Sequence, residues 1–232
     1  MSRIIGTSVD LPIVKFQNKE IIEKIQSGKM YLKNLEWFRE KERQTGDMTI
    51  GDLLEGMLHI SEGYIQIYDS DGKVIECVPL TDSAITTSFS NAFVFCATNI
   101  FPDENGNVFA DNQKPVFKEF GDTALVIENK GEFIKRIYKA AKELGYEVFY
   151  GVVNYYNKDE DNANMHISLL HGMHNIAFWK PDTYKVQQEF RIVLWKKGAN
   201  KDYIEFDIGD ISDISKVISI EEALRIQIKK QA

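Results

Sequence analysis

The chain has 232 residues, a formal net charge of −7 and 44% hydrophobic residues, which is the composition of a folded protein with a full core. Lys and Arg are interspersed with acids, which excludes a broad basic surface that would hold nucleic acid nonspecifically. No apolar run approaches the ~20 residues that a membrane-spanning helix needs, and residues 1–7 lack the apolar core of a signal peptide. We therefore expect one soluble, cytoplasmic domain over residues 1–232 that does not bind membranes.

The first elements predicted along the chain are a strand, a helix and a second strand. Residues 11–17 form the first strand, and Asn18 offers an N-cap to a helix over residues 19–27. Gly28 ends this helix, because glycine is the usual residue after a helix C-terminus. Residues 30–32 then form the second strand.

Two polar stretches follow this opening. Residues 37–43 form the first, and its residues 39–43 are interpreted as a solvated helical face, because charged side chains usually stay in water. Residues 51–56 predict one helical turn, and Glu55 is interpreted as its exposed end.

A hairpin comes next, since residues 69–72 (Asp-Ser-Asp-Gly) provide a turn between strands over residues 64–68 and 74–78. Further strands are expected over residues 84–89, which are rich in hydroxyl groups, and over residues 93–97.

The second half of the chain alternates loops, strands and two helices. The expected elements are a long surface loop over 102–114, strands over 123–128, 148–153, 203–206 and 217–220, a helix over 133–144 ended by Gly145, and a C-terminal helix from Glu221. Strands outnumber helices and several pair as hairpins. The predicted fold class is therefore α+β, a single domain with split, mostly antiparallel sheets and few helices.

Residues 184–195 carry the most informative pattern. With the period of a strand, Phe190 and its even-numbered neighbours form an apolar face. Gln187, Glu189 and Arg191 then share the opposite face. An amide, a carboxylate and a guanidinium in a row are either a solvated sheet face or a functional site.

Several familiar chemistries are not supported by the sequence. His166, His171 and His174 lie close together, but their spacing fits no zinc pattern, and we expect no metal site. Cys77 and Cys96 lie in apolar strand-like runs and are expected to be buried free thiols of a reducing cytosol. Nucleophile elbows and glycine-rich phosphate loops are absent from the sequence, so the usual Rossmann NAD and ATP sites are not expected.

The order of these segments resembles the ADP-ribosyltransferase fold. That family has a first strand and a helix ending in Gly that open the NAD cleft, then a Ser/Thr-rich strand, then a late Glu-x-Glu or Gln-x-Glu pair. The chain is most similar to poorly characterised bacterial and phage proteins, some of them linked to abortive infection. The shared motifs are Gly-Lys-x-Tyr-Leu at 28–32, an acidic-Glu-Gly turn at 52–56 and Gln-x-Glu-x-Arg at 187–191.

The resemblance implies an NAD site and assigns its residues. Glu189 becomes the catalytic carboxylate that stabilises an oxocarbenium-like state, and Gln187 orients the acceptor. The resemblance further implies that NAD, as the substrate, is bound by six residues: Lys15, Gln17, Tyr31, Thr87, Ser88 and Arg191. Among these, the hydroxyls of Thr87 and Ser88 are expected to hold Glu189 in position. The implied partners are NAD or a related nucleotide and a macromolecular acceptor, or a host or phage protein.

Two other functions stay open. The family usually has Arg or His on the first strand, and this chain has Lys15, which suggests a non-catalytic protein that sequesters a nucleotide signal or blocks a partner protein. A metal-dependent enzyme acting on phosphates is the third hypothesis, and its candidate ligands are Glu42, Asp47, Asp52 and Glu55.

Overall fold

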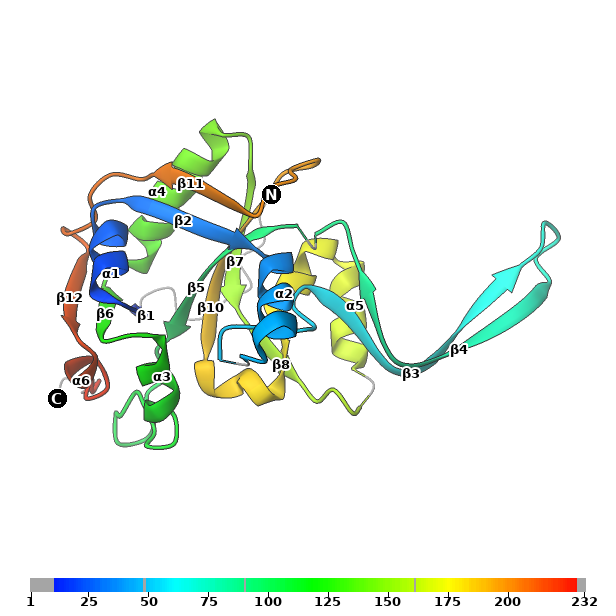
Figure 1. Ribbon diagram of the computed structural model, residues 1–232, viewed down its shortest axis with the longest axis horizontal. Helices are drawn as coiled ribbons and strands as arrows, with labels where there is room; N and C mark the ends of the chain where they lie inside the picture. The colour runs from blue at the N-terminus through cyan, green and yellow to red at the C-terminus, as the bar shows by residue number, and fades with distance from the viewer. Residues whose placement is uncertain (1–10, 48, 90, 161, 229–232) are drawn as a thin grey trace.

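The computed structural model of the protein describes residues 11–47, 49–89, 91–160 and 162–228. Its main sheet has eight strands, and all of their pairings are antiparallel. The strands are β1 (Ile13–Gln17), β2 (Lys29–Asn34), β5 (Phe93–Asn99), β6 (Thr123–Ile127), β7 (Glu147–Val152), β10 (Glu189–Trp195), β11 (Tyr203–Asp207) and β12 (Ser215–Ser219). With helices packed around this sheet, the predicted α+β class is confirmed (Figure 1).

The main sheet is split along one edge of β5. The other edge of β5 pairs with β10 over six residues. On the split edge, β2 pairs only with the start of β5, where Lys33 lies opposite Val94. The β1 strand pairs only with its end, where Val14 lies opposite Thr98. The two strands therefore diverge from β5 and leave its middle without a register partner on that side among the described residues.

The strand–helix–strand opening is confirmed. Helix α1 (Lys19–Gln26) joins β1 to β2 and buries Ile22 and Ile25 against the core, as its apolar spacing predicts. Gly28 follows with a φ of +93°, a conformation that favours glycine. The helix therefore ends where the sequence places its stop.

Two apolar cores cover the two faces of the sheet. One is covered by α1 and α4 (Lys130–Glu143), and α4 buries Phe133, Ile134 and Ile137. The other packs against α3 (Lys114–Phe120) and α6 (Ile220–Ala223), with Phe117 fully buried. The sequence did not predict α3, and the expected C-terminal helix is only one turn long.

A third core forms between the main sheet and a group of short elements. These are α2 (Leu35–Thr45), α5 (Ala163–Leu170), the 3-10 helix η1 (Met173–Phe178) and the parallel strands β8 (Asn154–Tyr156) and β9 (Trp179–Pro181). A second 3-10 helix, η2 (Asp182–Gln187), follows β9 directly. Arg39 of α2 is buried and donates to the carbonyl oxygen of Glu55. The interpretation of residues 39–43 as a solvated face is therefore wrong at Arg39.

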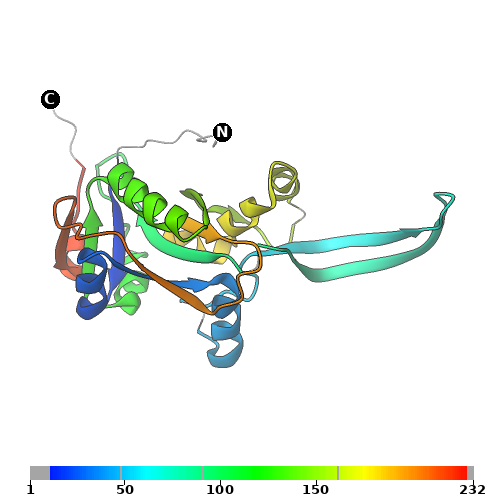
Figure 2. The same cartoon turned by 90° about the horizontal axis from the view of Figure 1, so that it is seen from above.

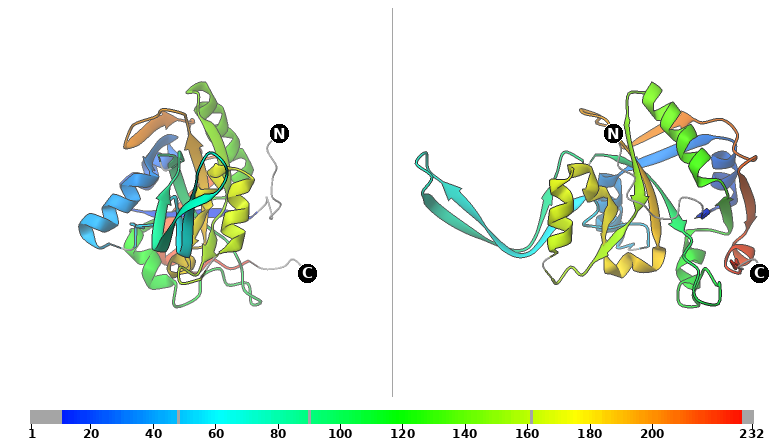
Figure 3. Two further views of the ribbon diagram at one scale, coloured as in Figure 1. Left: turned by 90° about the vertical axis from the view of Figure 1, so that its right-hand side faces the viewer. Right: turned by 180° about the vertical axis from the view of Figure 1, so that it is seen from behind.

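Strands β3 (Met57–Tyr68) and β4 (Val74–Thr86) form a long ribbon that projects from the rest of the molecule (Figures 1, 2 and 3). We call it the arm. The predicted hairpin is confirmed, and it continues to the body because residues 84–86 belong to β4 rather than to a separate strand. Cys77 lies on the arm and is exposed, so its predicted burial is wrong. The apolar run that contains Cys77 is not covered by a core, because β3 and β4 pair only with each other.

Shortening the arm is expected to leave the body intact. Replacing residues 63–80 by an Asn-Gly turn should change the free energy of unfolding by less than about 1 kcal/mol, since an isolated two-stranded ribbon adds little stability. Urea unfolding followed by circular dichroism measures this. Leu125→Ala, in the core, is the positive control and should cost about 2–5 kcal/mol. A loss of similar size in the shortened protein would contradict the expectation.

None of the helices in the described part of the chain is long and apolar enough to cross a membrane.

Candidate functional site

Five ionisable side chains are buried together beside the third core. They are the acids Asp52, Glu55 and Glu189 and the bases Lys180 and Arg191. We call them the charge cluster. Two of the acids come from the turn between α2 and β3, the lysine comes from β9, and the last two residues come from β10. Charged residues are almost never fully buried unless they are paired, so this cluster is the strongest candidate for a site.

The alternation of β10 explains why two of its charges reach the cluster. Phe190 and Ile192 point into the main core, so Glu189 and Arg191 point to the other face. The expected period of two is confirmed over this strand. The interpretation as a solvated face is wrong, because Glu189 is 7% exposed and Arg191 is 1% exposed.

Arg191 connects the acids of the cluster. Its two terminal nitrogens donate to the two carboxylate oxygens of Glu55 at 2.7 and 2.8 Å, the bidentate geometry that suits a guanidinium. Its Nε donates to Glu189 Oε2 at 2.7 Å, and one terminal nitrogen also donates to the carbonyl oxygen of Ala177. Glu55, interpreted from the sequence as an exposed helix end, is thus a buried partner of β10.

Lys180 bonds the other oxygen of Glu189. Its Nζ donates to Glu189 Oε1 at 2.8 Å and to Gln187 Oε1 at 3.2 Å, and it lies 4.1 Å from the ring centroid of Tyr184. The amide nitrogen of Gln187 donates to the carbonyl oxygen of Thr49. Glu189 and Gln187, the two residues predicted to be catalytic, are therefore held by the same ammonium group.

The surroundings fix the charge of Glu189. Burial disfavours its ionised form, but Arg191 and Lys180 outweigh burial and hold the pKa of Glu189 well below its usual range. Glu189 also holds the pKa of Lys180 above its usual value despite burial. Glu189, Lys180 and Arg191 are therefore charged at neutral pH.

Asp52 behaves in the opposite way. Burial, and then the negative charge of Glu55, raises the pKa of Asp52 to about 7, against the pull of Lys180 and Arg191. The cluster has three acids and two bases, so it is electrically neutral when Asp52 is protonated. Two carboxyl groups in one site thus have pKa values driven apart, which is typical of an acid–base site.

The strand predicted over residues 184–195 begins only at Glu189. Residues before it form the 3-10 helix η2, and Gln188 has a φ of +47°. Gln187 therefore reaches the cluster from a helical turn rather than from the face of β10. Gln187 therefore does not continue the row of Glu189 and Arg191 on one strand, as the sequence predicts, and instead meets the cluster through its contact with Lys180.

Thr87 and Ser88 do not hold Glu189. They follow the end of β4, where Thr87 Oγ1 accepts from the backbone of Phe89 and the carbonyl oxygen of Ser88 accepts from Trp195. Trp195 is the last residue of β10, and Glu189 is the first. The prediction is wrong because these residues lie at the far end of the strand.

The other predicted NAD contacts lie apart from the cluster. The Lys15 ammonium lies 5.4 Å from the ring centroid of Phe95, on the main-core face of the sheet. Burial lowers the pKa of Lys15, while Cys96 and then Glu189 act to raise it. Gln17 accepts from the backbone of its neighbour, and the 48% exposed Tyr31 stacks on Tyr203 at 4.9 Å.

Neither the role of Lys180 nor the burial of the two acids in the 52–56 turn was predicted from the sequence. Lys180 lies nine residues before Glu189 in the three-residue strand β9, which is too short to show a periodicity. For the two acids, the signal in the sequence was the acidic-Glu-Gly turn at 52–56, which is one of the motifs shared with the resembled proteins.

Histidine and cysteine chemistry finds no support here. No group of three His, Cys, Asp or Glu that could hold a metal ion is found within the described residues. His174 stacks on Phe149 with ring centroids 4.1 Å apart. Burial, and then Glu189, raises the pKa of Cys96 to about 12, so this partly buried thiol is protonated and a poor nucleophile.

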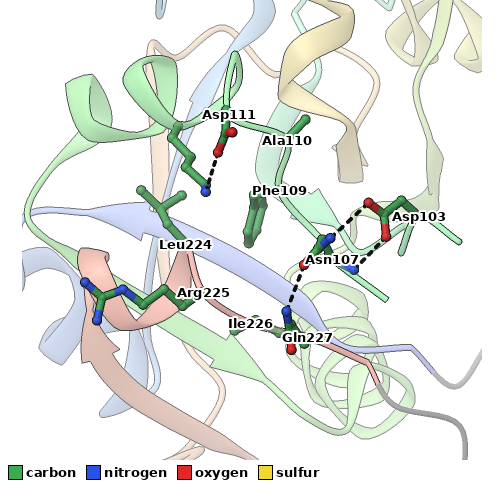
Figure 4. A pocket seen from close by; sticks show the side chains of 10 residues that line it. Asp103, Asn107, Phe109, Ala110, Asp111, Leu224, Arg225, Ile226 and Gln227 are labelled. Carbon is green, nitrogen blue, oxygen red and sulfur yellow. Dashed lines mark hydrogen bonds and ion pairs between the residues drawn. The ribbon is translucent and has the colours of Figure 1, made fainter. Parts of the chain in front are cut away.

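A pocket of about 350 Å³ lies elsewhere on the molecule, between the loop after β5 and the C-terminal segment (Figure 4). Its lining includes Phe109, Leu224 and Asn107, and Asn107 bonds Asp103 and Gln227. None of the lining residues belongs to the charge cluster.

Comparison of the chain with protein-family models, with curated proteins and with solved structures gives no match. The split sheet and the charge cluster are therefore the features that bear on function.

Proposed function

We propose that the chain is an ADP-ribosyltransferase-like protein of the cytoplasm that binds NAD as its substrate and transfers ADP-ribose to a macromolecule. One observation carries the proposal: Glu189 is a buried, ionised carboxylate at the start of β10, held by Lys180 and Arg191 and separated from β1 by a single strand, β5. Thr98 has Glu189 opposite it on one side and Val14 of β1 on the other. The resemblance suggests phage–host conflict as the setting.

The chemistry of the cluster suits this reaction. Cleavage of the bond between nicotinamide and ribose leaves positive charge on the ribose, and a fixed carboxylate stabilises that charge. Each carboxylate oxygen accepts more than one hydrogen bond, so Glu189 can receive the 2-hydroxyl of ribose while Lys180 and Arg191 stay bound. Lys15, on β1, is the residue that the resemblance assigns to the pyrophosphate.

A second candidate is binding without turnover, in which the protein sequesters a nucleotide signal or blocks a partner protein. The observation that favours it is that both oxygens of Glu189 are bonded to cations, at 2.8 Å from Lys180 and 2.7 Å from Arg191. Neutralisation by two cations weakens the attraction of the carboxylate for an oxocarbenium ion.

Nicotinamide release from labelled NAD tests the proposal. Wild type is expected to release nicotinamide, and Glu189→Gln should lower the rate about 100-fold or more, because it removes a charge that acts in the transition state. Glu205→Gln is the matched control, since Glu205 is an exposed strand carboxylate on β11. Its rate should equal that of wild type.

Thermal melting with and without NAD separates the two candidates. Stabilisation of both wild type and Glu189→Gln by NAD, with no nicotinamide released, would select binding without turnover. If wild type neither releases nicotinamide nor is stabilised, both NAD functions are lost.

A further inference from the structure

Asp52 is a buried carboxyl group that is only half satisfied. One oxygen accepts from the backbone of Leu54 at 2.9 Å. The other, Oδ2, is buried and has no hydrogen-bond partner among the described residues. Its nearest cation, Lys180, is 4.0 Å away, which is too long for a hydrogen bond.

A second unsatisfied oxygen lies in the same region. The hydroxyl of Tyr156 is buried and also lacks a hydrogen-bond partner among the described residues. Tyr156 belongs to β8, whose parallel pairing with β9 brings it beside the segment of Lys180. The charge of Asp52 acts on this phenol. Unsatisfied buried polar groups are rare, and two near one ion cluster indicate a place for a polar ligand group.

The groups around Asp52 are charged side chains and phenols. The charged side chains are Glu55 from its own turn, Lys180 from β9, Arg191 from β10 and Arg39 from α2, and the phenols are those of Tyr156 and Tyr184. Tyr184 donates to Glu42, so its proton is engaged. Among the three acids of the cluster, only Asp52 has an oxygen without a hydrogen-bond partner in the part of the chain that the structure describes.

We propose that Asp52 is the general base of the site, which takes the proton of the acceptor during ADP-ribose transfer; this role rests on the proposed function. The acceptor is a hydroxyl compound, and it is water when NAD is hydrolysed. The bond between ribose C1 and the nicotinamide nitrogen breaks, and its electron pair returns to the nicotinamide ring. The acceptor oxygen then bonds to C1, and its proton moves to Asp52 Oδ2.

This role gives two carboxylates two tasks. Glu189 holds a permanent negative charge for the ribose, and Asp52 exchanges a proton near neutral pH. Lys180 Nζ lies 2.8 Å from Glu189 and 4.0 Å from Asp52. The carboxylate of Glu189 therefore stays paired with this cation when Asp52 takes up a proton.

The pH dependence of NAD hydrolysis tests the assignment. From pH 5 to 9 the wild-type rate should rise with a midpoint near 7, where Asp52 becomes ionised. Asp52→Asn should lower the plateau rate about 100-fold and remove the rise, while KM for NAD stays within a few-fold, because Asp52 acts on the acceptor. Asp71→Asn, in the exposed turn of the arm, is the matched control and should keep both the plateau rate and the rise with pH.

The outcomes distinguish this inference from the proposed function. If wild type hydrolyses NAD and Asp52→Asn keeps its rate and its rise, the role of Asp52 is overturned and the NAD function stands. If wild type hydrolyses no NAD, both are overturned.

Stability measured without NAD provides a second readout. The folded pKa of Asp52 lies above its unfolded value, so wild type loses stability as pH rises from about 4 to about 7. Asp52→Asn stays neutral and should gain in melting temperature over wild type across that window. If the difference in melting temperature between Asp52→Asn and wild type is the same at pH 5 and pH 8, the assignment is overturned. It is also overturned if Asp52→Asn is less stable than wild type at pH 8.

Discussion

Replacing Arg191 by Met is expected to lower the free energy of unfolding by about 3–5 kcal/mol. The change removes four hydrogen bonds, leaves Glu55 without its bidentate partner and leaves Glu189 with Lys180 alone. Arg191 is 1% exposed, so water does not replace the lost bonds. The midpoint of urea unfolding, with the slope compared to wild type, measures the loss.

Arg136 provides the matched control. It also bonds two acids, Asp213 and Glu132, but it does so at the surface of the molecule. Arg136→Met should therefore cost no more than about 1 kcal/mol. Equal losses for the two variants would contradict the view that burial, rather than pairing alone, makes the cluster important.

The double variant Arg191→Met/Glu55→Met refines the result. It removes the acid that the single change leaves unpaired, so it should be less destabilised than the sum of the two single variants. Additive losses would show that the two side chains act independently, against the bidentate geometry between them.

The part of the site that follows from local pattern could be predicted from the sequence. The alternation of residues 189–194 placed Glu189 and Arg191 on one face, and Gly28 marked the end of α1. Both inferences use neighbours within a few residues, where backbone geometry fixes the direction of each side chain. The α+β class followed in the same way from the succession of short strands and helices.

The rest depends on contacts between distant segments. Glu55 meets Arg191 across 136 positions of the chain, and no periodicity indicates such a pair. The left-handed Gln188 is equally hidden, since glutamine is not a typical residue for that conformation. Thr87 and Ser88 were misplaced because a strand assignment gives a direction but not the end of the sheet at which it stops.

Gly28→Ala is expected to destabilise the protein by more than about 2 kcal/mol. The left-handed backbone costs an alanine about 1–2 kcal/mol, and a Cβ at this position would lie 2.2 Å from the carbonyl oxygen of Gly209. Relief requires backbone movement, which would strain the bond from Ile208 N to the Gly28 carbonyl oxygen, now 2.9 Å long. Urea unfolding measures the loss.

Gly198→Ala separates the two causes. Gly198 has a φ of +75° and open space around its Cα, so its alanine variant should show only the conformational cost of about 1–2 kcal/mol. The excess loss at Gly28 then reports the contact with Gly209, which joins the end of α1 to the segment after β11. Equal losses at both glycines would mean that the protein relieves the contact between residue 28 and Gly209 at little cost in free energy. In that case Gly28 would be required only as the helix stop that its sequence context predicts, and not for the packing of the strand–helix–strand unit.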